Sequence, residues 1–347
     1  MTPKEVILGA IALKPVERIP FALLLGGSWA LNTHNLPFQA VFSRPVGEVA
    51  GIMVEAYHAA GSDMVWAAPG SGNLIVQAFG GELKFRRAGP PDVINPVIQD
   101  LKTLENMDIE QFKKDPLLHR IMEITHCILE KTQAHFAVGG SMWGPLTLAG
   151  LFYGTEPLMR DMRRNKQAVH TILDWTTRLY LTYIEDYIKN GIDLITMGEP
   201  TASGDMISRE HFAEFLVPAL KKIYRSLSGR GVKTCLHICG NVENRLDLIA
   251  ETGVDVVSLD YKVSLKKARE VFKGRIAFAG NVDPVAVLQD GTAEAIRQTC
   301  NQCIADAGVD GFMLMPGCDI SPSTPLEHIK TMMQVARSYP VQGEYHA

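Results

Sequence analysis

NGIDLITMG (190–198) joins a turn signal to an apolar run. A glycine and an aspartate, separated by one residue, lead into a run of apolar, β-favouring residues. This is the pattern expected where a helix ends at a C-cap glycine and a short turn enters a buried strand. The same phrase recurs in AGSDMV (60–65), TGVDVV (252–257) and AGVDGF (307–312). The repetition predicts a chain in which helices and buried strands alternate.

Eight short runs are apolar on both faces, which is typical of strands buried in a parallel sheet. They are 19–25, 63–68, 134–140, 192–198, 233–239, 254–260, 275–281 and 311–317. Helical periodicity predicts helices over 45–61, 101–132, 156–190, 208–230, 241–252, 264–273, 292–308 and 325–338. Eight alternations favour one α/β domain over 1–347, a (β/α)8 TIM barrel, because a doubly wound sheet usually stops near about six strands.

The interval between the second and third predicted strands is long. It contains VQAFGGELKFRRAGPPDVINP (76–96), in which a GG turn is flanked by strand-like residues. This pattern predicts a β-hairpin inserted into the barrel.

Composition excludes some classes of partner. The 347 residues carry a formal net charge of -4, with 46% hydrophobic and 21% charged residues, so neither a nucleic acid nor an anionic membrane is an expected partner. The segment 1–20 predicts an amphipathic first helix that is too short to span a bilayer. We expect a cytoplasmic protein with reduced thiols, whose six cysteines serve in burial, metal binding or catalysis rather than in disulfides.

In a barrel of this type the active site lies at the carboxyl ends of the strands. The residues expected at those ends are Gly26, Gly27, Ser28, Pro69, Gly70, Ser141, Trp143, Glu199, His237, Cys239, Asp260, Tyr261, Asn281, Asp283, Cys318 and Asp319. Among them, we expect Ser141, Trp143, Asn281 and Asp283 to bind substrate.

CLHICGN (235–241) places a histidine and a cysteine two positions apart at a strand end. Residues i and i+2 of a strand project to the same side, so His237 and Cys239 can reach one point. Cys318, after the eighth predicted strand, lies at the same rim. One imidazole and two thiolates suit Zn²⁺, and three protein ligands leave a fourth position open, as in catalytic zinc sites.

A simpler interpretation of these cysteines is that they are small buried hydrophobes. This interpretation is favoured for the C-x-x-C pair Cys300 and Cys303, which falls inside the helical pattern 293–308, and for Cys127 and Cys235. It is less favoured where a histidine and two cysteines meet at one rim.

Two acids are candidate catalytic groups. Glu199 and Asp260 can each orient a substrate, act as a general base, or serve as a reversible fourth metal ligand. The alternative for Glu199 is that it caps the helix starting near Ser208 or pairs with a basic residue. Asp283 precedes Pro284 and can likewise cap the next helix.

At these residues the sequence resembles the uroporphyrinogen decarboxylase superfamily, and within it the methylcobamide:coenzyme M methyltransferases. The resemblance spans almost the whole chain, and H-I-C-G and P-G-C-D are its most specific elements. It rests on PVERIP (15–20), GGSMWGPLTLAGLFYG (139–154), GEPTASGDMISREHFAEFLVP (198–218), LHICGNV (236–242), AGNVDP (279–284) and MPGCDISPSTPLEHIKTM (315–332).

The resemblance favours the methyltransferase branch. Decarboxylases of this superfamily carry an arginine-rich stretch after the first strand that grips the porphyrinogen carboxylates, whereas ALLLGGSWALNTH (22–34) has no arginine. The superfamily's zinc triad is retained as His237, Cys239 and Cys318.

The resemblance implies a mechanism and partners. Zinc would activate a thiol acceptor such as coenzyme M, and the thiolate would take the methyl group of a methylated corrinoid, of the methylcobalamin type, carried by a separate small corrinoid protein. Glu199 or Asp260 would accept the thiol proton. Relatives suggest a monomer or a homodimer. The alternatives are a decarboxylase-like enzyme and a non-catalytic barrel that binds a corrinoid or another tetrapyrrole.

Overall fold

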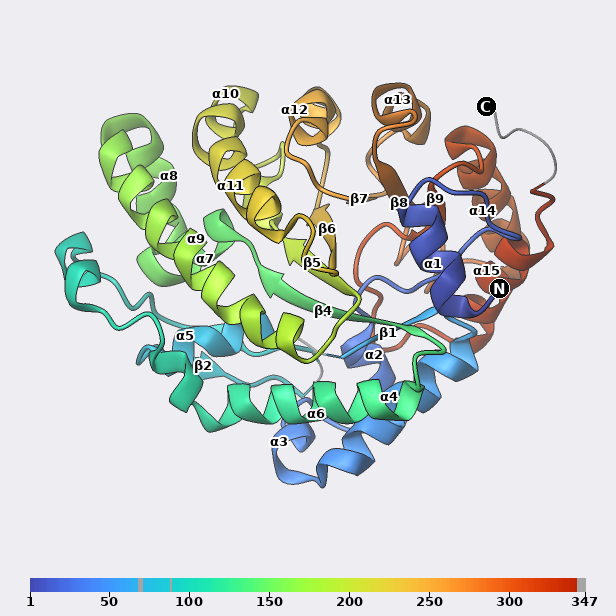
Figure 1. Cartoon of the computed structure of the whole chain (residues 1–347), viewed down its shortest axis with the longest axis horizontal. Coiled ribbons are helices and arrows are strands. Elements are labelled where there is room, and N and C mark those ends of the chain that lie inside the picture. The colour runs from blue at the N-terminus through green and yellow to red at the C-terminus, as the bar shows by residue number, and fades with distance from the viewer. Residues whose placement is uncertain (68–70, 88, 342–347) are drawn as a thin grey trace.

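Seven parallel strands form the centre of the molecule. The computed structural model describes residues 1–67, 71–87 and 89–341. The strands are β1 (Met64–Trp66), β4 (Ala137–Trp143), β5 (Leu194–Gly198), β6 (Lys233–Ile238), β7 (Val256–Leu259), β8 (Ala277–Val282) and β9 (Phe312–Pro316). Each pairs in parallel with the next, in the order β1-β4-β5-β6-β7-β8-β9. The sheet is curled, and helices lie around its outside (Figure 1).

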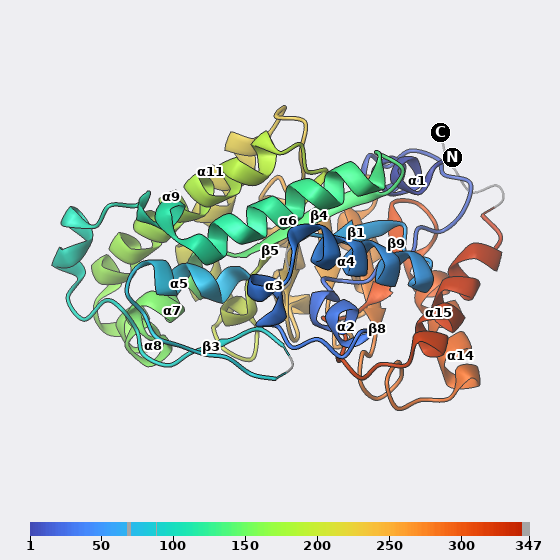
Figure 2. The same cartoon turned by 90° about the horizontal axis from the view of Figure 1, so that it is seen from below.

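The longer helices connect successive strands. The α-helices are α1 (Pro3–Ile11), α2 (Gly27–Asn32), α3 (Ala40–Ser43), α4 (Val46–Ala60), α5 (Leu74–Ala78), α6 (Pro116–Thr132), α7 (Pro145–Tyr153), α8 (Thr155–Arg164), α9 (Lys166–Lys189), α10 (Arg209–His211), α11 (Val217–Leu227), α12 (Leu246–Ala250), α13 (Leu265–Phe272), α14 (Ala293–Ala307) and α15 (Leu326–Ser338). Short 3-10 segments are η1 (Ser71–Asn73), η2 (Leu101–Asn106), η3 (Gln111–Lys114), η4 (Pro200–Ala202) and η6 (Glu243–Arg245), and η5 (Phe212–Leu216) is π-helical. Helices α4 and α6 run side by side over β1 and β4 (Figure 2).

The glycines of the repeated glycine-and-aspartate phrase lie at the predicted turns between a helix and a strand. All four glycines of the phrase have positive φ: Gly61 (70°), Gly191 (82°), Gly253 (88°) and Gly308 (76°). A residue with a side chain is strained in this conformation, so glycine is favoured where each helix turns into its strand.

Three of the four aspartates of the phrase tie a strand to a neighbouring segment. Asp193 accepts a hydrogen bond from the backbone N–H of Val138 (3.0 Å), and Asp255 accepts one from Thr234 (2.9 Å). Asp63 accepts one from Phe21 (2.9 Å) and is paired with Arg18. The phrase therefore sets both the turn and the start of strand pairing.

The strand predicted at 19–25 does not form. Phe21 makes a single parallel bridge to Leu314 of β9, and the carbonyl of Phe21 accepts a hydrogen bond from the N–H of Asp63, just before β1 (2.8 Å). The segment thus contacts both edge strands of the sheet without extending along either. Pro20 has no N–H to donate, and the chain leaves the extended conformation at Leu25 and Gly26 (φ 59° and 64°) to enter α2.

Several predicted helices are divided by local capping. The helix expected over 101–132 becomes two 3-10 turns and α6, which begins at Pro116 because Asp115 caps the N–H groups of Leu117 and Leu118 (2.9 and 3.0 Å). The helix expected over 156–190 divides at Asn165, which caps α9. Prediction missed the short helices α2, α3, α5 and α7.

The segment between β1 and β4 holds a small antiparallel pair, β2 (Leu83–Lys84) with β3 (Asp92–Val93). Gly80 and Gly81 do not form the turn of this pair. They follow α5, and the chain from Phe85 to Pro91, of which residue 88 lies outside the described residues, connects the two short strands.

None of the helices in the described ranges has the length and apolar character that crossing a membrane requires.

Candidate metal centre

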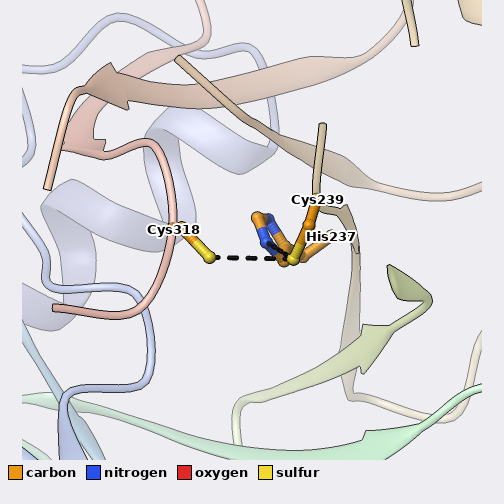
Figure 3. A group of neighbouring side chains, drawn as sticks. All are labelled: His237, Cys239 and Cys318. Atoms are coloured by element: carbon orange, nitrogen blue, oxygen red, sulfur yellow. Dashed lines mark hydrogen bonds between the residues drawn. The ribbon is translucent and has the colours of Figure 1, made fainter. Parts of the chain in front are cut away.

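The side chains of His237, Cys239 and Cys318 converge at the carboxyl ends of β6 and β9. The Cys239 sulfur lies 3.3 Å from His237 Nε2 and 3.7 Å from the Cys318 sulfur (Figure 3). One ligand atom from each of the three residues lies within 4.8 Å of the others. Cys239 and Cys318 are 79 positions apart in the chain, so the sheet brings them together.

Strand geometry explains the convergence. His237 lies near the end of β6 and Cys239 directly follows it, on the same side, while Ile238 between them packs into the core at 2% exposure. The ring of His237 is itself held from the next strand, because its Nδ1 lies 3.1 Å from the hydroxyl of Ser258 in β7. This leaves Nε2 directed at the sulfurs.

Two of the three distances between these atoms are close to those expected around a tetrahedral zinc ion. Two sulfurs at about 2.3 Å from one Zn²⁺ are about 3.8 Å apart, and a sulfur and a nitrogen are about 3.6 Å apart. The distances of 3.7 and 3.3 Å are close to these values. The donor set of one imidazole and two thiols is of the soft kind that Zn²⁺ favours.

The two thiols interact directly. The contact with Cys318 lowers the pKa of Cys239, and the same contact, together with burial, raises the pKa of Cys318. The two sulfurs are therefore close enough to share one proton or to bind one metal ion.

A cavity opens beside the cluster. It is lined by Leu25, Gly27, Ser28, Gly72, Pro90, Ser141, Met142, Trp143, Thr196, Gly198, His237, Cys239, Cys318 and Asp319. Nine of these fourteen residues lie in β4, β5 or β6 or just after β6 or β9, toward the carboxyl ends of the strands, where the sequence predicted the active site. Burial raises the pKa of Asp319 to about 6.

Two of the four predicted substrate-binding residues line this cavity, Ser141 and Trp143. The indole N–H of Trp143 donates to Asn73 Oδ1 (2.6 Å), and the ring packs over Gly198, where a Cβ would lie 2.7 Å from it. The aromatic wall of the cavity is thus fixed from two sides.

The other two predicted substrate-binding residues make hydrogen bonds within the protein. The side-chain amide of Asn281 donates to the carbonyls of Asp260 (3.0 Å) and Val263 (2.7 Å). Asp283 accepts from the N–H groups of Val285 and Ala286 (both 2.9 Å) and so caps a turn. It does not cap the next helix, the alternative considered for it, because α14 begins at Ala293 with Thr292 as its N-cap. Neither lines the cavity among the described residues.

Glu199 is fully buried and caps a helix. Its carboxylate accepts hydrogen bonds from the N–H of Leu146 (2.9 Å) and from the N–H and hydroxyl of Thr147 (2.9 and 2.7 Å), at the start of α7. Burial raises the pKa of Glu199 to about 7. The helix it caps is α7 rather than the helix near Ser208, which Ser208 caps itself. The catalytic role of Glu199 stays a prediction.

Asp260 holds the loop that carries Cys239. Its Oδ2 accepts from the N–H of Gly240 (2.8 Å) and its Oδ1 from the N–H of Lys262 (2.9 Å). The carboxylate is buried at 4% exposure and lies outside the cavity lining of the described residues. Its catalytic role also stays a prediction.

The remaining cysteines pack in the interior or against it. Cys235 and Cys300 are buried, Cys303 is 8% exposed and Cys127 is half-buried. Pro69 and Gly70, expected at the rim, lie outside the described residues.

Prediction did not assign a role to Ser258 or to Asp319. Ser258 gives no sequence signal, because its relation to His237 depends on the register of β6 with β7. Asp319 was signalled only by its position directly after Cys318.

Fold and site together define an α/β protein of repeated parallel β–α units with a nitrogen-and-sulfur ligand group at the carboxyl ends of its strands. The chain belongs to the uroporphyrinogen decarboxylase (URO-D) family, whose model matches residues 2–339.

Several relatives in this family are methyltransferases by name. The chain is 28% identical to a methylcobamide:CoM methyltransferase, MtbA, of Methanosarcina acetivorans, covering 97% of this chain and 98% of that protein. It is 25% identical to MtaA, a methylcobamide:CoM methyltransferase of Methanosarcina barkeri, with the same coverage. A uroporphyrinogen decarboxylase of Legionella pneumophila is 24% identical over 78% of this chain and 77% of that protein.

Solved structures agree in fold. A methyltransferase from Methanosarcina mazei superposes with a TM-score of 0.86 and 26% identity, covering 97% of this chain and 98% of that one. A B12-independent methionine synthase from Shewanella sp. shares the fold, with a TM-score of 0.56 and 13% identity, covering 84% of this chain and 86% of that one.

Proposed function

We propose that this protein is a zinc-dependent methyltransferase that moves a methyl group from a methylated corrinoid on a partner protein to a small thiol. The observation that carries the proposal is the convergence of His237 Nε2 and the sulfurs of Cys239 and Cys318 beside a cavity at the carboxyl ends of the strands. The names of the relatives, methylcobamide:CoM methyltransferases, support the same reaction class.

His237, Cys239 and Cys318 would hold the metal. Zn²⁺ bound there would supply a Lewis acid that lowers the pKa of an acceptor thiol. The chain's own contribution is to fix the ligands. Ser258 holds the imidazole through Nδ1 and Asp260 holds the backbone N–H that follows Cys239. Such supporting hydrogen bonds orient metal ligands.

The reaction is a methyl transfer between two nucleophiles. A sulfur–carbon bond to the acceptor forms while the cobalt–carbon bond of the corrinoid breaks, and the bonding electron pair stays with cobalt. The thiol proton leaves to solvent, with Glu199 or Asp260 as the predicted base that accepts it first. Trp143 and Met142 wall the cavity in which the acceptor lies. Apolar walls exclude water from the reacting sulfur.

The cavity wall is less suited to decarboxylation of a porphyrinogen. The arginine-free segment 22–34 contributes Leu25, Gly27 and Ser28 to the wall, and Asp319 adds a carboxylate. A substrate with several carboxylates would be repelled by Asp319 and would gain no cation from this segment.

The proposal also includes the architecture of the domain. We propose that the seven strands and the segment at Phe21, which hydrogen-bonds toward both edge strands, make a TIM-barrel-like domain that spans the chain. The match of the family model to residues 2–339 supports one domain.

The first experiment measures zinc. Elemental analysis of the purified protein should give about one zinc per chain, and His237→Ala, Cys239→Ala and Cys318→Ala should each lose most of it. The matched control is Cys235→Ala, which removes a buried thiol from the same strand as His237 and should keep the metal.

Methyl transfer is then followed with free methylcobalamin as donor and 2-mercaptoethanol as acceptor. Activity should be lost in the three ligand variants and kept in the Cys235 control. A parent protein without zinc, or a Cys239→Ala variant with full activity, would refute the proposed function.

A further inference from the structure

The cavity beside the cluster contains a carboxylate that the proposed methyl transfer does not use. Asp319 directly follows Cys318, and both line the cavity. The described lining residues include no lysine or arginine.

Asp319 is held in place by the protein. Its Oδ1 accepts a hydrogen bond from the N–H of Gly26 (2.7 Å), and the N–H of Ile320 also donates to the carboxylate. Gly26 is fixed in turn, because the neighbouring carbonyl of Leu25 accepts a hydrogen bond from the hydroxyl of the buried Tyr57. The carboxylate therefore has a defined position.

The carboxylate keeps capacity for a further donor. A carboxylate offers about four acceptor positions, and the two backbone N–H groups occupy two of them. Because Asp319 lines the cavity, a ligand there can take up the remaining capacity. The ligand group that best complements this carboxylate is an ammonium, because it brings both a hydrogen-bond donor and a positive charge.

The spacing suits a short ligand. Consecutive Cα atoms are about 3.8 Å apart, so Asp319 and Cys318 begin from adjacent points of the chain. A molecule whose sulfur lies at the cluster therefore needs only a short carbon chain for its other end to reach Asp319.

We propose that the acceptor is a small amino thiol, with its sulfur at His237, Cys239 and Cys318 and its ammonium group at Asp319. This inference rests on the proposed function and adds the class of acceptor. A thiol that carries a sulfonate, such as coenzyme M, would bring a second negative charge beside Asp319 and would be disfavoured.

Three acceptors of one skeleton test the proposal. Cysteamine, 2-mercaptoethanol and coenzyme M share the unit HS–CH2–CH2 and differ at the end, which is an ammonium, a hydroxyl or a sulfonate. With free methylcobalamin as donor, kcat/KM should fall in that order, and cysteamine should exceed coenzyme M by about tenfold or more, the factor of one charge-assisted hydrogen bond. Calorimetric binding of the three thiols to the zinc protein, without donor, should give the same order.

Asp319→Asn separates recognition from the intrinsic reactivity of the thiols. An asparagine oxygen can still accept from the N–H of Gly26, while the charge is lost. The ratio of kcat/KM for cysteamine to kcat/KM for coenzyme M should fall about tenfold relative to the parent. The ratio of the two binding affinities should fall by the same factor. Asp290→Asn, which removes an exposed carboxylate in the loop after β8, should leave the ratio unchanged.

A second variant covers the case in which Asp319→Asn does not fold. Ser28→Lys adds a cation to the cavity lining and should shift the ratio toward coenzyme M. A parent that prefers coenzyme M, or a cysteamine preference that Asp319→Asn leaves intact, would overturn the inference while the methyltransferase stands. Failure to methylate all three thiols, together with absence of zinc, would instead refute the proposed function.

Discussion

Asp260 accepts a hydrogen bond from the backbone N–H of Gly240 at 2.8 Å, across 20 positions of the chain. Gly240 follows Cys239, so a carboxylate on the loop after β7 fixes the loop that carries a ligand from β6. Ligand geometry at this site is therefore set by neighbours that do not line the cavity.

Asp260→Asn should weaken zinc binding by about tenfold, because the loss of a supporting hydrogen bond to a metal site has effects of about 10- to 100-fold. Competition with a chromophoric chelator measures the affinity. Asp255→Asn is the control, since Asp255 holds Thr234 at the opposite end of the same two strands and should alter stability but not zinc affinity. Parental affinity in Asp260→Asn would exclude the supporting role.

Ser258→Ala should also weaken zinc binding by about tenfold. The hydroxyl lies 3.1 Å from His237 Nδ1, and its loss frees the ring to rotate and change tautomer. The rate of zinc release to excess chelator should rise. Ser226→Ala removes a hydroxyl that bonds only within α11 and should leave that rate at the parental value. Equal release from both variants would argue against the role of Ser258.

Glu199 should make the protein less stable as pH rises from about 4.5 to about 7. Burial raises the pKa of Glu199 from 4.5 to about 7, so between these values the folded state binds more protons than the unfolded state, and the free energy of unfolding falls with pH. The slope from this group is at most about 1.4 kcal/mol per pH unit.

Urea denaturation at several pH values, compared between the parent and Glu199→Gln, isolates this contribution. The glutamine cannot ionise, so the fall that Glu199 causes should be absent in the variant. Its stability should also be lower by a constant amount, because an amide NH2 replaces one of the two oxygens that accept from α7. A difference between the two proteins that does not vary with pH would show that Glu199 ionises in the ordinary range.

Gly198→Ala should displace Trp143 and impair acceptor binding. A Cβ at Gly198 would lie 2.7 Å from the Trp143 ring, and overpacking of this kind costs about 1–3 kcal/mol of stability. The KM for the thiol should rise by a larger factor than kcat falls, since the cavity wall moves while the metal ligands stay in place. Tryptophan fluorescence and steady-state kinetics measure the two effects.

Gly51→Ala is the matched control for Gly198→Ala. Gly51 lies inside α4 with nothing within 4 Å of an added Cβ, so alanine should raise stability by up to about 1 kcal/mol and leave KM unchanged. A KM effect as large as that of Gly198→Ala would mean that any small change in packing reaches the cavity.

The strand–helix alternation and the cluster of His237, Cys239 and Cys318 can be predicted from the sequence. Seven of the eight predicted strands lie within or overlap strands of the sheet, because the glycine turns and the apolar runs are local features. The pairing of His237 with Cys239 followed from the two-residue period of a strand, and the rim position of Cys318 followed from the order of strands.

The partners of the buried acids and the edges of the sheet could not be predicted, because they depend on contacts between distant segments. Glu199 caps α7 through residues 52 and 53 positions away, Asp260 holds Gly240, and Asp319 lines the cavity. Phe21 makes one bridge where a strand was predicted. The physical reason is the same in each case: a buried polar group must find a partner, and the partners available are on segments that folding alone brings within reach.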